Sequence, residues 1–154
     1  MYGERIKSLK EVRFVIDNLC DDTVLELKKT LGKDYKRKTF QIIRAIRKDK
    51  FIIKLKSTNE PVGVFGLIPV NEKAGGIFLL TCDSLHKGNL ITFLKGSRKQ
   101  IDKWCEEYEL IMDNLYKQNE TIKKWLRLLG FKPSEYQDDD FQVYYRGNLK
   151  YYEA

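Results

Sequence analysis

The stretch from Ile77 to Phe131 decides the fold. It reads IFLLTCDSLHKGNLITFLKGSRKQIDKWCEEYELIMDNLYKQNETIKKWLRLLGF. Four apolar residues in a row, from Ile77 to Leu80, predict a strand that is covered on both faces of a sheet. A polar loop with one glycine and a long amphipathic helix follow. A second strand over Leu110–Leu115 and a helix that ends at Leu129-Gly130-Phe131 complete a strand–helix–strand–helix order.

The segment before this stretch predicts a helical layer and then strands. A short strand over Ile6–Leu9 opens the chain, and apolar residues at helical spacing predict three helices. These cover Glu11–Leu19, a segment from an Asp21, Asp22 or Thr23 cap to Gly32, and Lys36–Arg47. A period of two then predicts strands over Phe51–Lys56 and Val62–Val70, with turns at Ser57–Pro61 and Asn71–Gly76.

The segment after Leu115 predicts a capped helix and a last strand. Asn119 is a suitable N-cap residue, Gly130 stands where a left-handed C-cap is expected, and Pro133 stops the helix. Phe141–Arg146 predicts a final strand at the sheet edge. Residues 1–154 are therefore expected to form a single α/β (α+β) domain, with a mixed, mostly antiparallel sheet flanked by helices.

Composition narrows the class of protein. The chain is 42% hydrophobic and 12% aromatic, which is typical of a globular protein. It has no apolar run of about 18 residues and no signal segment, so we expect a cytoplasmic protein with no membrane partner. Three widely spaced cysteines and one histidine predict buried free thiols and no metal site.

The positive charge is concentrated. The chain carries +7, and the segment Lys28–Lys50 holds ten Lys and Arg residues against Asp34 and Asp49. Such a basic face attracts nucleic acid, the diphosphate of CoA or an acidic protein. The alternative is a solvated, lysine-rich helix face without a partner.

The order of elements resembles the GNAT acyltransferase superfamily over nearly the whole chain. The most specific match is the last helix, which the family opens with Asn and closes with Gly-Phe, as Asn119, Gly130 and Phe131 do here. Leu79–Leu85, Phe93-Leu94-Lys95 and Trp125-Leu126 also look like the small GNAT-like proteins of tailed bacteriophages, some of which are virion components.

The resemblance implies an acetyl-CoA site and an amine substrate. The pantetheine arm would pair with the central strand, and the diphosphate would bind backbone N–H groups where the long helix begins. Helix N-termini favour anions for the same reason. The cofactor-binding residues implied in this way are Leu80, Thr81, Cys82, His86, Lys87, Gly88, Asn89 and Asn119.

The chain departs from the family at three positions. Leu85 and Leu90 stand where the diphosphate loop has Gln or Arg and a small residue, so of the three loop positions only Gly88 matches. Leu126 stands where many members have the Tyr that protonates the CoA thiolate. Tyr116, just before that helix, is the candidate substitute, and its alternative role is that of a packed aromatic residue.

Acetyl transfer to an amine also needs a base that removes the ammonium proton. Asp83, after the central strand, and Asp113, in the next strand, are the candidate carboxylates, with turn or capping roles as the alternative.

Two hypotheses therefore stay open. The chain is an N-acetyltransferase that moves acetyl from CoA to a primary amine by direct attack. Alternatively, it is a non-catalytic GNAT-like structural or interaction protein of a phage virion, whose basic face binds DNA or an acidic partner. The second hypothesis places it in the host cytoplasm or the virion.

Overall fold

The computed structural model describes residues 2–86 and 90–152. In chain order its elements are β1 (Tyr2–Arg5), α1 (Leu9–Asp17), α2 (Asp21–Leu31), α3 (Tyr35–Ala45), β2 (Lys50–Lys54), β3 (Pro61–Pro69), β4 (Ala74–Thr81), α4 (Asp83–His86), α5 (Leu90–Glu107), β5 (Leu110–Tyr116), α6 (Glu120–Leu128), β6 (Lys132–Gln137), β7 (Phe141–Gly147) and the 3-10 helix η1 (Leu149–Tyr152).

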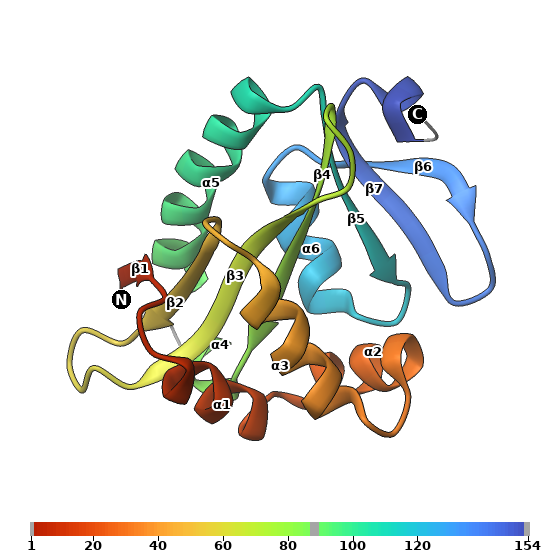
Figure 1. The fold of residues 1–154 in the computed structure, drawn as a ribbon. Helices are drawn as coiled ribbons and strands as arrows, with labels where there is room; N and C mark the ends of the chain where they lie inside the picture. The colour runs from red at the N-terminus through yellow and green to blue at the C-terminus, as the bar shows by residue number, and fades with distance from the viewer. Residues whose placement is uncertain (1, 87–89, 153–154) are drawn as a thin grey trace. The chain divides into compact units, whose positions relative to one another are not determined.

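Within the described residues, seven strands form a sheet in the order β1-β2-β3-β4-β5-β7-β6 (Figure 1). Strands β4 and β5 run parallel, whereas β1 with β2, β2 with β3, β5 with β7 and β6 with β7 are antiparallel. The predicted fold class is confirmed. The chain divides into two compact units, residues 1–66 with 79–93 and residues 67–78 with 94–154.

The first unit contains helices α1, α2, α3 and α4, strands β1 and β2, most of β3 and the end of β4. Helix α1 buries one stripe, formed by Val12, Val15 and Ile16, and α3 buries Ile43. The predicted first strand was misplaced, because β1 covers Tyr2–Arg5 rather than Ile6–Leu9. The hydroxyl of Ser8 accepts a hydrogen bond from the Lys10 N–H, and this N-cap starts the helix at Leu9.

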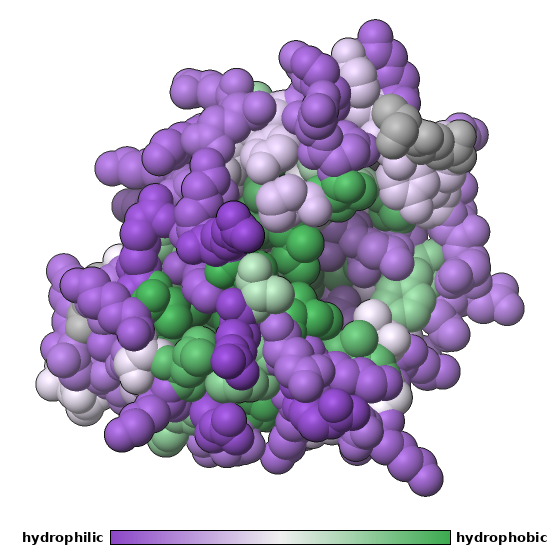
Figure 2. All heavy atoms as spheres, viewed as in Figure 1, coloured by the Kyte–Doolittle hydropathy of each residue, from purple (hydrophilic) through white to green (hydrophobic). Residues whose placement is uncertain are grey.

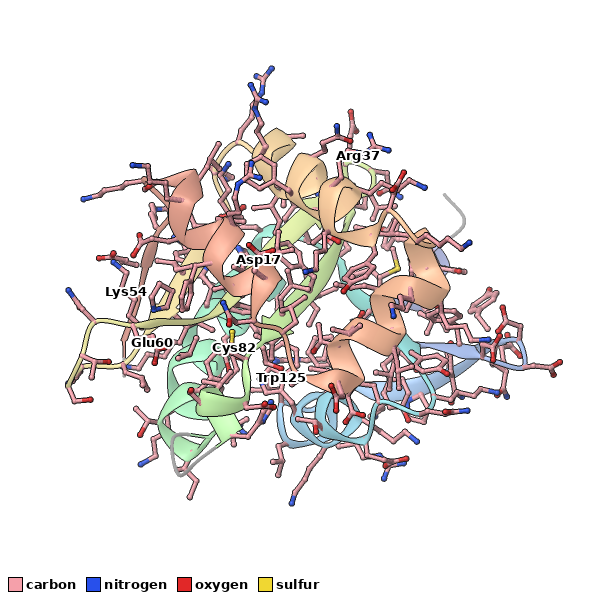
Figure 3. All side chains as sticks on the ribbon, turned by 90° about the horizontal axis from the view of Figure 1, so that it is seen from below. Asp17, Arg37, Lys54, Glu60, Cys82 and Trp125 are labelled. Carbon is pink, nitrogen blue, oxygen red and sulfur yellow. The ribbon has the colours of Figure 1, made fainter. Side chains whose placement is uncertain are left out.

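Lys54 of β2 forms ion pairs with residues of β1 and α1. Its side chain is 11% exposed, and its Nζ lies 2.6 Å from Glu4 Oε1 and 2.7 Å from Glu11 Oε2. The hydrogen bonds with Glu11 and Glu4 raise the pKa of Lys54 above its ordinary value. Figure 3 shows this side chain at the edge of the first unit.

The second unit is built around β5. Its register with β7 covers Leu110 to Tyr116 and is antiparallel, and β6 pairs with the other side of β7. The prediction that Phe141–Arg146 forms an edge strand was therefore wrong, because Lys132–Gln137 lies outside it. Strand β6 contains Pro133 and its residues are mostly exposed, so its sequence lacks the alternation of apolar and polar residues that predicts a strand.

The turn before β4 is shorter than predicted. The Asn71 side-chain oxygen accepts hydrogen bonds from the N–H groups of Lys73 and Ala74, which closes the turn at Ala74. Gly75 and Gly76 belong to β4 and pair with Ile111 and Met112 of β5.

Helix α6 has the predicted caps. The Asn119 side-chain oxygen accepts from the Ile122 N–H at 3.3 Å, and Gly130 has a φ of 86°. The Phe131 N–H then donates to the Leu126 carbonyl at 3.0 Å, as in a Schellman motif.

The face seen in Figure 2 is mostly hydrophilic, with apolar side chains showing between the polar ones. The exposed large apolar residues described in the first unit are Phe14, Leu25, Ile42 and Ile91.

None of the helices that the structure describes is long and apolar enough to cross a membrane.

Replacing Gly96 by alanine is expected to stabilise the protein by about 0.5–1 kcal/mol, because a glycine inside a helix costs conformational entropy. A Cβ at this position would meet nothing within 4 Å. Urea unfolding of the G96A variant measures the change. The matched control is Gly63→Ala, whose Cβ would lie 3.0 Å from the Leu80 carbonyl oxygen and should destabilise. A less stable G96A protein would contradict this account.

Candidate functional site

The end of β4 lies in the first unit and is paired on both sides. The Cys82 N–H donates to the Val62 carbonyl of β3 at 2.9 Å. On the opposite edge, the Thr81 carbonyl accepts the Cys20 N–H at 2.9 Å. An antiparallel bridge between Leu19 and Cys82 accompanies this bond. The segment before α2 is therefore fixed beside the end of the central strand.

Four polar side chains meet at this place. The Thr81 hydroxyl oxygen lies 3.2 Å from Cys20 Sγ, 3.3 Å from the Thr23 hydroxyl and 3.1 Å from His86 Nε2. Cys20 Sγ also lies 3.3 Å from the Thr23 hydroxyl. We call Cys20, Thr23, Thr81 and His86 the thiol cluster. Thr23 and Thr81 are each 1% exposed, Cys20 is 9% exposed and His86 is half-buried.

The cluster changes the acidity of its two titratable groups. Burial is the largest effect on the pKa of Cys20 and raises it, but hydrogen bonds with His86, Thr23 and Thr81 together outweigh burial and lower the pKa to about 7. The pKa of His86 is raised, first by its hydrogen bond with Cys20. Cys20 is also the N-cap residue of α2, where the helix dipole favours a negative charge. These shifts favour a thiolate beside an imidazolium.

Cys82 shows the opposite behaviour. Its Sγ lies 3.8 Å from the Val15 carbonyl oxygen, beside the end of α1 (Figure 3). Burial raises the pKa of Cys82 to about 12, so it stays a thiol at neutral pH. As predicted, the cysteines are free thiols; Cys20 and Cys82 are buried, whereas Cys105 is partly exposed.

The other predicted residues of the first unit lie around this strand end. Leu80 and Cys82 are buried in and directly after β4, whereas Asp83 is exposed as the first residue of α4. Leu85, at the family's Gln or Arg position, is fully buried. Its side chain therefore cannot contact a diphosphate in solvent.

Three predicted cofactor-binding residues, Lys87, Gly88 and Asn89, lie outside the described residues.

The predicted catalytic residues of the second unit do not share a face. Asp113 and Tyr116 both belong to β5, three positions apart, so their side chains point to opposite sides of the sheet. Tyr116 is 4% exposed, and its ring centroid lies 5.6 Å from that of Phe141. Asp113 is half-buried and opposite Tyr144 in the register with β7. Tyr116 is therefore packed against another aromatic ring, which is the alternative to a catalytic role that the sequence left open.

Asn119 is 1% exposed and caps α6. Its side-chain oxygen accepts the hydrogen bond from the Ile122 N–H, within the second unit.

Sequence reasoning did not single out Cys20 or Thr23. The available signal was the position of Cys20 before Asp-Asp-Thr, where a helix cap was expected at Asp21, Asp22 or Thr23. The partners Thr81 and His86 are distant in sequence, so only the fold brings them to the thiol.

Among the residues that the structure describes, no group of three or more His, Cys, Asp or Glu side chains could hold a metal ion.

Comparison with known proteins gives a result at the level of fold. No family model matches the chain, and no curated protein matches its sequence. A domain from Methanocaldococcus jannaschii is similar in structure, with a TM-score of 0.71 and 16% identity over 96% of this chain and 97% of that chain. The GNAT domain of S. lividans PAT has a TM-score of 0.69 and 8% identity over 94% of this chain and 88% of that chain.

Spermidine N-acetyltransferase from Vibrio cholerae, solved in complex with CoA and spermine, is also similar. Its TM-score is 0.62, with 13% identity over 98% of this chain and 97% of that chain. At sequence identities this low, the structural similarity is evidence for the fold alone. The mixed sheet, the helices that flank it and these relatives together show that the chain has the GNAT fold.

Proposed function

We propose that residues 1–154 form one GNAT-like domain that binds acetyl-CoA and transfers acetyl to a primary amine by direct attack. The observation that carries this proposal is the short parallel pairing of β4 with β5. Within the second unit, residues Ala74–Gly76 of β4 pair with residues Leu110–Met112 of β5. Both strands continue beyond this pairing, β4 to Phe78 within this unit and β5 to Tyr116. A strand whose pairing ends early offers backbone groups to an extended ligand that carries amides, as a pantetheine arm does.

The chain fits CoA in part. The pantetheine arm is proposed to lie along Leu79 and Leu80, because the Thr81 carbonyl and the Cys82 N–H of the segment Leu79–Cys82 are already bonded to Cys20 and Val62. The backbone of the residues before α5, with Lys87, is proposed to hold the diphosphate. Because the Leu85 side chain is buried, backbone N–H groups and the helix dipole must carry most of the diphosphate binding. The CoA and spermine in the V. cholerae relative support a CoA thioester as donor and an amine as acceptor.

The proton-transfer roles remain proposals. Asp83 is exposed and can accept the ammonium proton of an amine that reaches it. Tyr116 and Asp113 point to opposite faces of β5, so they cannot act on one reacting centre from the same side. We therefore propose either Tyr116 as general acid or Asp113 as base in the second unit, but not both.

Calorimetric titration with acetyl-CoA tests the function. Binding is expected at submillimolar cofactor, and acetyl-CoA at 100 times its Kd should stabilise the folded protein by about 2.7 kcal/mol. Titrations with pantetheine and with adenosine diphosphate separate the two halves of the ligand. Because the Leu85 side chain is buried, the L85R variant is a poor test of the diphosphate contact. The absence of any heat of binding at millimolar acetyl-CoA would contradict the enzyme hypothesis.

The second candidate function is a non-catalytic interaction protein, such as a phage virion component, that binds DNA or an acidic partner. The observation that favours it is the exposure of the basic segment: all of the ten Lys and Arg residues between Lys28 and Lys50 except Lys50 are exposed. Failure to bind acetyl-CoA, together with DNA affinity that falls steeply with salt, would favour this function.

A further inference from the structure

The thiol cluster has a composition that packing alone does not require. It joins an N-cap residue of α2, a residue of α2 itself, the last residue of β4 and the last residue of α4. Two hydroxyls and one imidazole surround a single thiol, and the Thr81 hydroxyl contacts the other three polar groups. Buried structural cysteines usually lie among apolar groups and are chemically inert.

Cys82 and Cys105 provide the comparison within the same chain. Burial raises the pKa of Cys105 as well as that of Cys82. Cys20 has the lowered pKa, the imidazole partner and the helix N-terminus. Its 9% exposure and the half-buried His86 place the cluster at the edge of the first unit's core rather than at its centre.

We propose that Cys20 is a covalent modification site whose thiolate accepts the acyl group of a thioester, as a second acceptor beside the amine. The choice of acetyl-CoA as the donor rests on the proposed function. The assignment of Cys20 as a thiolate rests on the contacts of the thiol cluster. The Cys20 N–H is bonded to the Thr81 carbonyl at 2.9 Å, so the thiol lies at the end of the segment proposed for the pantetheine arm. A thioester carbonyl that reaches the end of β4 would therefore be beside Cys20 Sγ.

The step is balanced within the cluster. The Cys20 thiolate donates its electron pair to the thioester carbonyl carbon and forms a new S–C bond. The bond from that carbon to the donor sulfur breaks, and the donor leaves as a thiolate. His86 gives its proton to the departing thiolate and becomes a neutral imidazole. No oxidant, reductant or metal is needed, and one thioester replaces another.

The charged groups that face the cluster come from two elements. Asp83 of α4 and Asp22 of α2 both raise the pKa of His86. These carboxylates favour the imidazolium, which in turn favours the Cys20 thiolate. The pH dependence of the reaction at this site is therefore expected to follow the ionisation of Cys20 and His86.

Alkylation with iodoacetamide, followed by peptide mapping, tests the thiolate on the wild-type chain. At pH 7 a thiol with a pKa of about 7 is roughly half ionised, whereas an ordinary thiol is ionised by a few per cent. Cys20 should therefore react about tenfold faster than Cys105, with a rate that levels off above pH 8. The H86Q variant should lose about tenfold of the Cys20 rate at pH 7, and the C105S control should keep it. Equal rates at Cys20 and Cys105 would overturn the proposal.

Intact-mass analysis after incubation with acetyl-CoA, and separately with S-acetyl-N-acetylcysteamine, tests the acyl step. One acetyl group on wild type and C105S, absent from C20S, is expected with both donors. Acetyl-CoA binding without acetylation of Cys20 by either donor would refute this inference and leave the proposed function intact. Acetylation by the small donor without acetyl-CoA binding would support the thiolate acceptor and refute the proposed function.

Discussion

Replacing Gly147 by alanine is expected to destabilise the protein by about 3 kcal/mol or more. Gly147 ends β7 with a φ of +102°, which L side chains rarely adopt. A Cβ at this position would lie 2.2 Å from the Glu109 carbonyl oxygen and 3.1 Å from the Glu109 carbonyl carbon. Both are backbone atoms next to β5, so the end of the β5–β7 pair must shift to make room. Chemical denaturation of the G147A variant measures the loss.

Gly130 is the matched control for the backbone conformation. It has a φ of +86° in the same unit, but a Cβ there would have its nearest neighbour, Arg146 Cδ, at 4.0 Å. Gly130→Ala should therefore cost only about 1 kcal/mol, the strain of the left-handed backbone. The difference between the two variants measures the clash with Glu109. Equal losses would show that backbone strain alone explains the role of Gly147.

Truncating Trp125 to alanine is expected to cost about 3–5 kcal/mol. The side chain lies in α6 and is 2% exposed. Its Nε1–H donates to the Ser97 hydroxyl of α5 at 3.2 Å. The variant removes a large apolar contact and leaves a cavity, because neighbouring side chains relax only in part. Thermal and urea unfolding measure the effect.

The hydrogen bond can be separated from the packing by a double-mutant cycle. Ser97 is 3% exposed, and Ser97→Ala removes the acceptor of the Trp125 N–H, at an expected cost of about 1–3 kcal/mol. Trp125→Phe combined with Ser97→Ala should show a coupling energy of about 1 kcal/mol. Leu128, exposed by 47% in the same helix, is the control, and Leu128→Ala should change stability by less than about 0.5 kcal/mol. A W125A loss no larger than that of L128A would contradict the packing role.

Elements with strong local signals were predicted from sequence to within a few residues. Helix α6 had an Asn cap, an apolar stripe and a glycine stop, and all three act within one short segment. Strand β4 had an unbroken apolar run. Strands β1 and β6 were missed or misplaced because they lie at the two edges of the sheet. An edge strand buries less surface and needs no apolar alternation, so its pairing depends on partners that are distant in sequence.

The candidate site was less predictable than the fold. Asp113 and Tyr116 were chosen for their chemistry, but the pleat of β5 turns them to opposite faces. Asn119 was expected both as a helix cap and as a cofactor residue, and the cap is what its side chain forms. Cys20 carried no motif and had been assigned to the buried free thiols.

The sequence by itself determined the order of the longer helices and the inner strands, and the ends of α6, because these depend on local periodicity and capping. The tertiary structure decided which side chains meet. Cys20 and Thr81 are 61 positions apart, and they come within 3.2 Å because the segment before α2 pairs with the end of β4. Long-range backbone pairing of this kind leaves no local pattern. The stretch from Ile77 to Phe131 therefore identifies the fold, while Cys20, the proposed acyl acceptor, lies outside it.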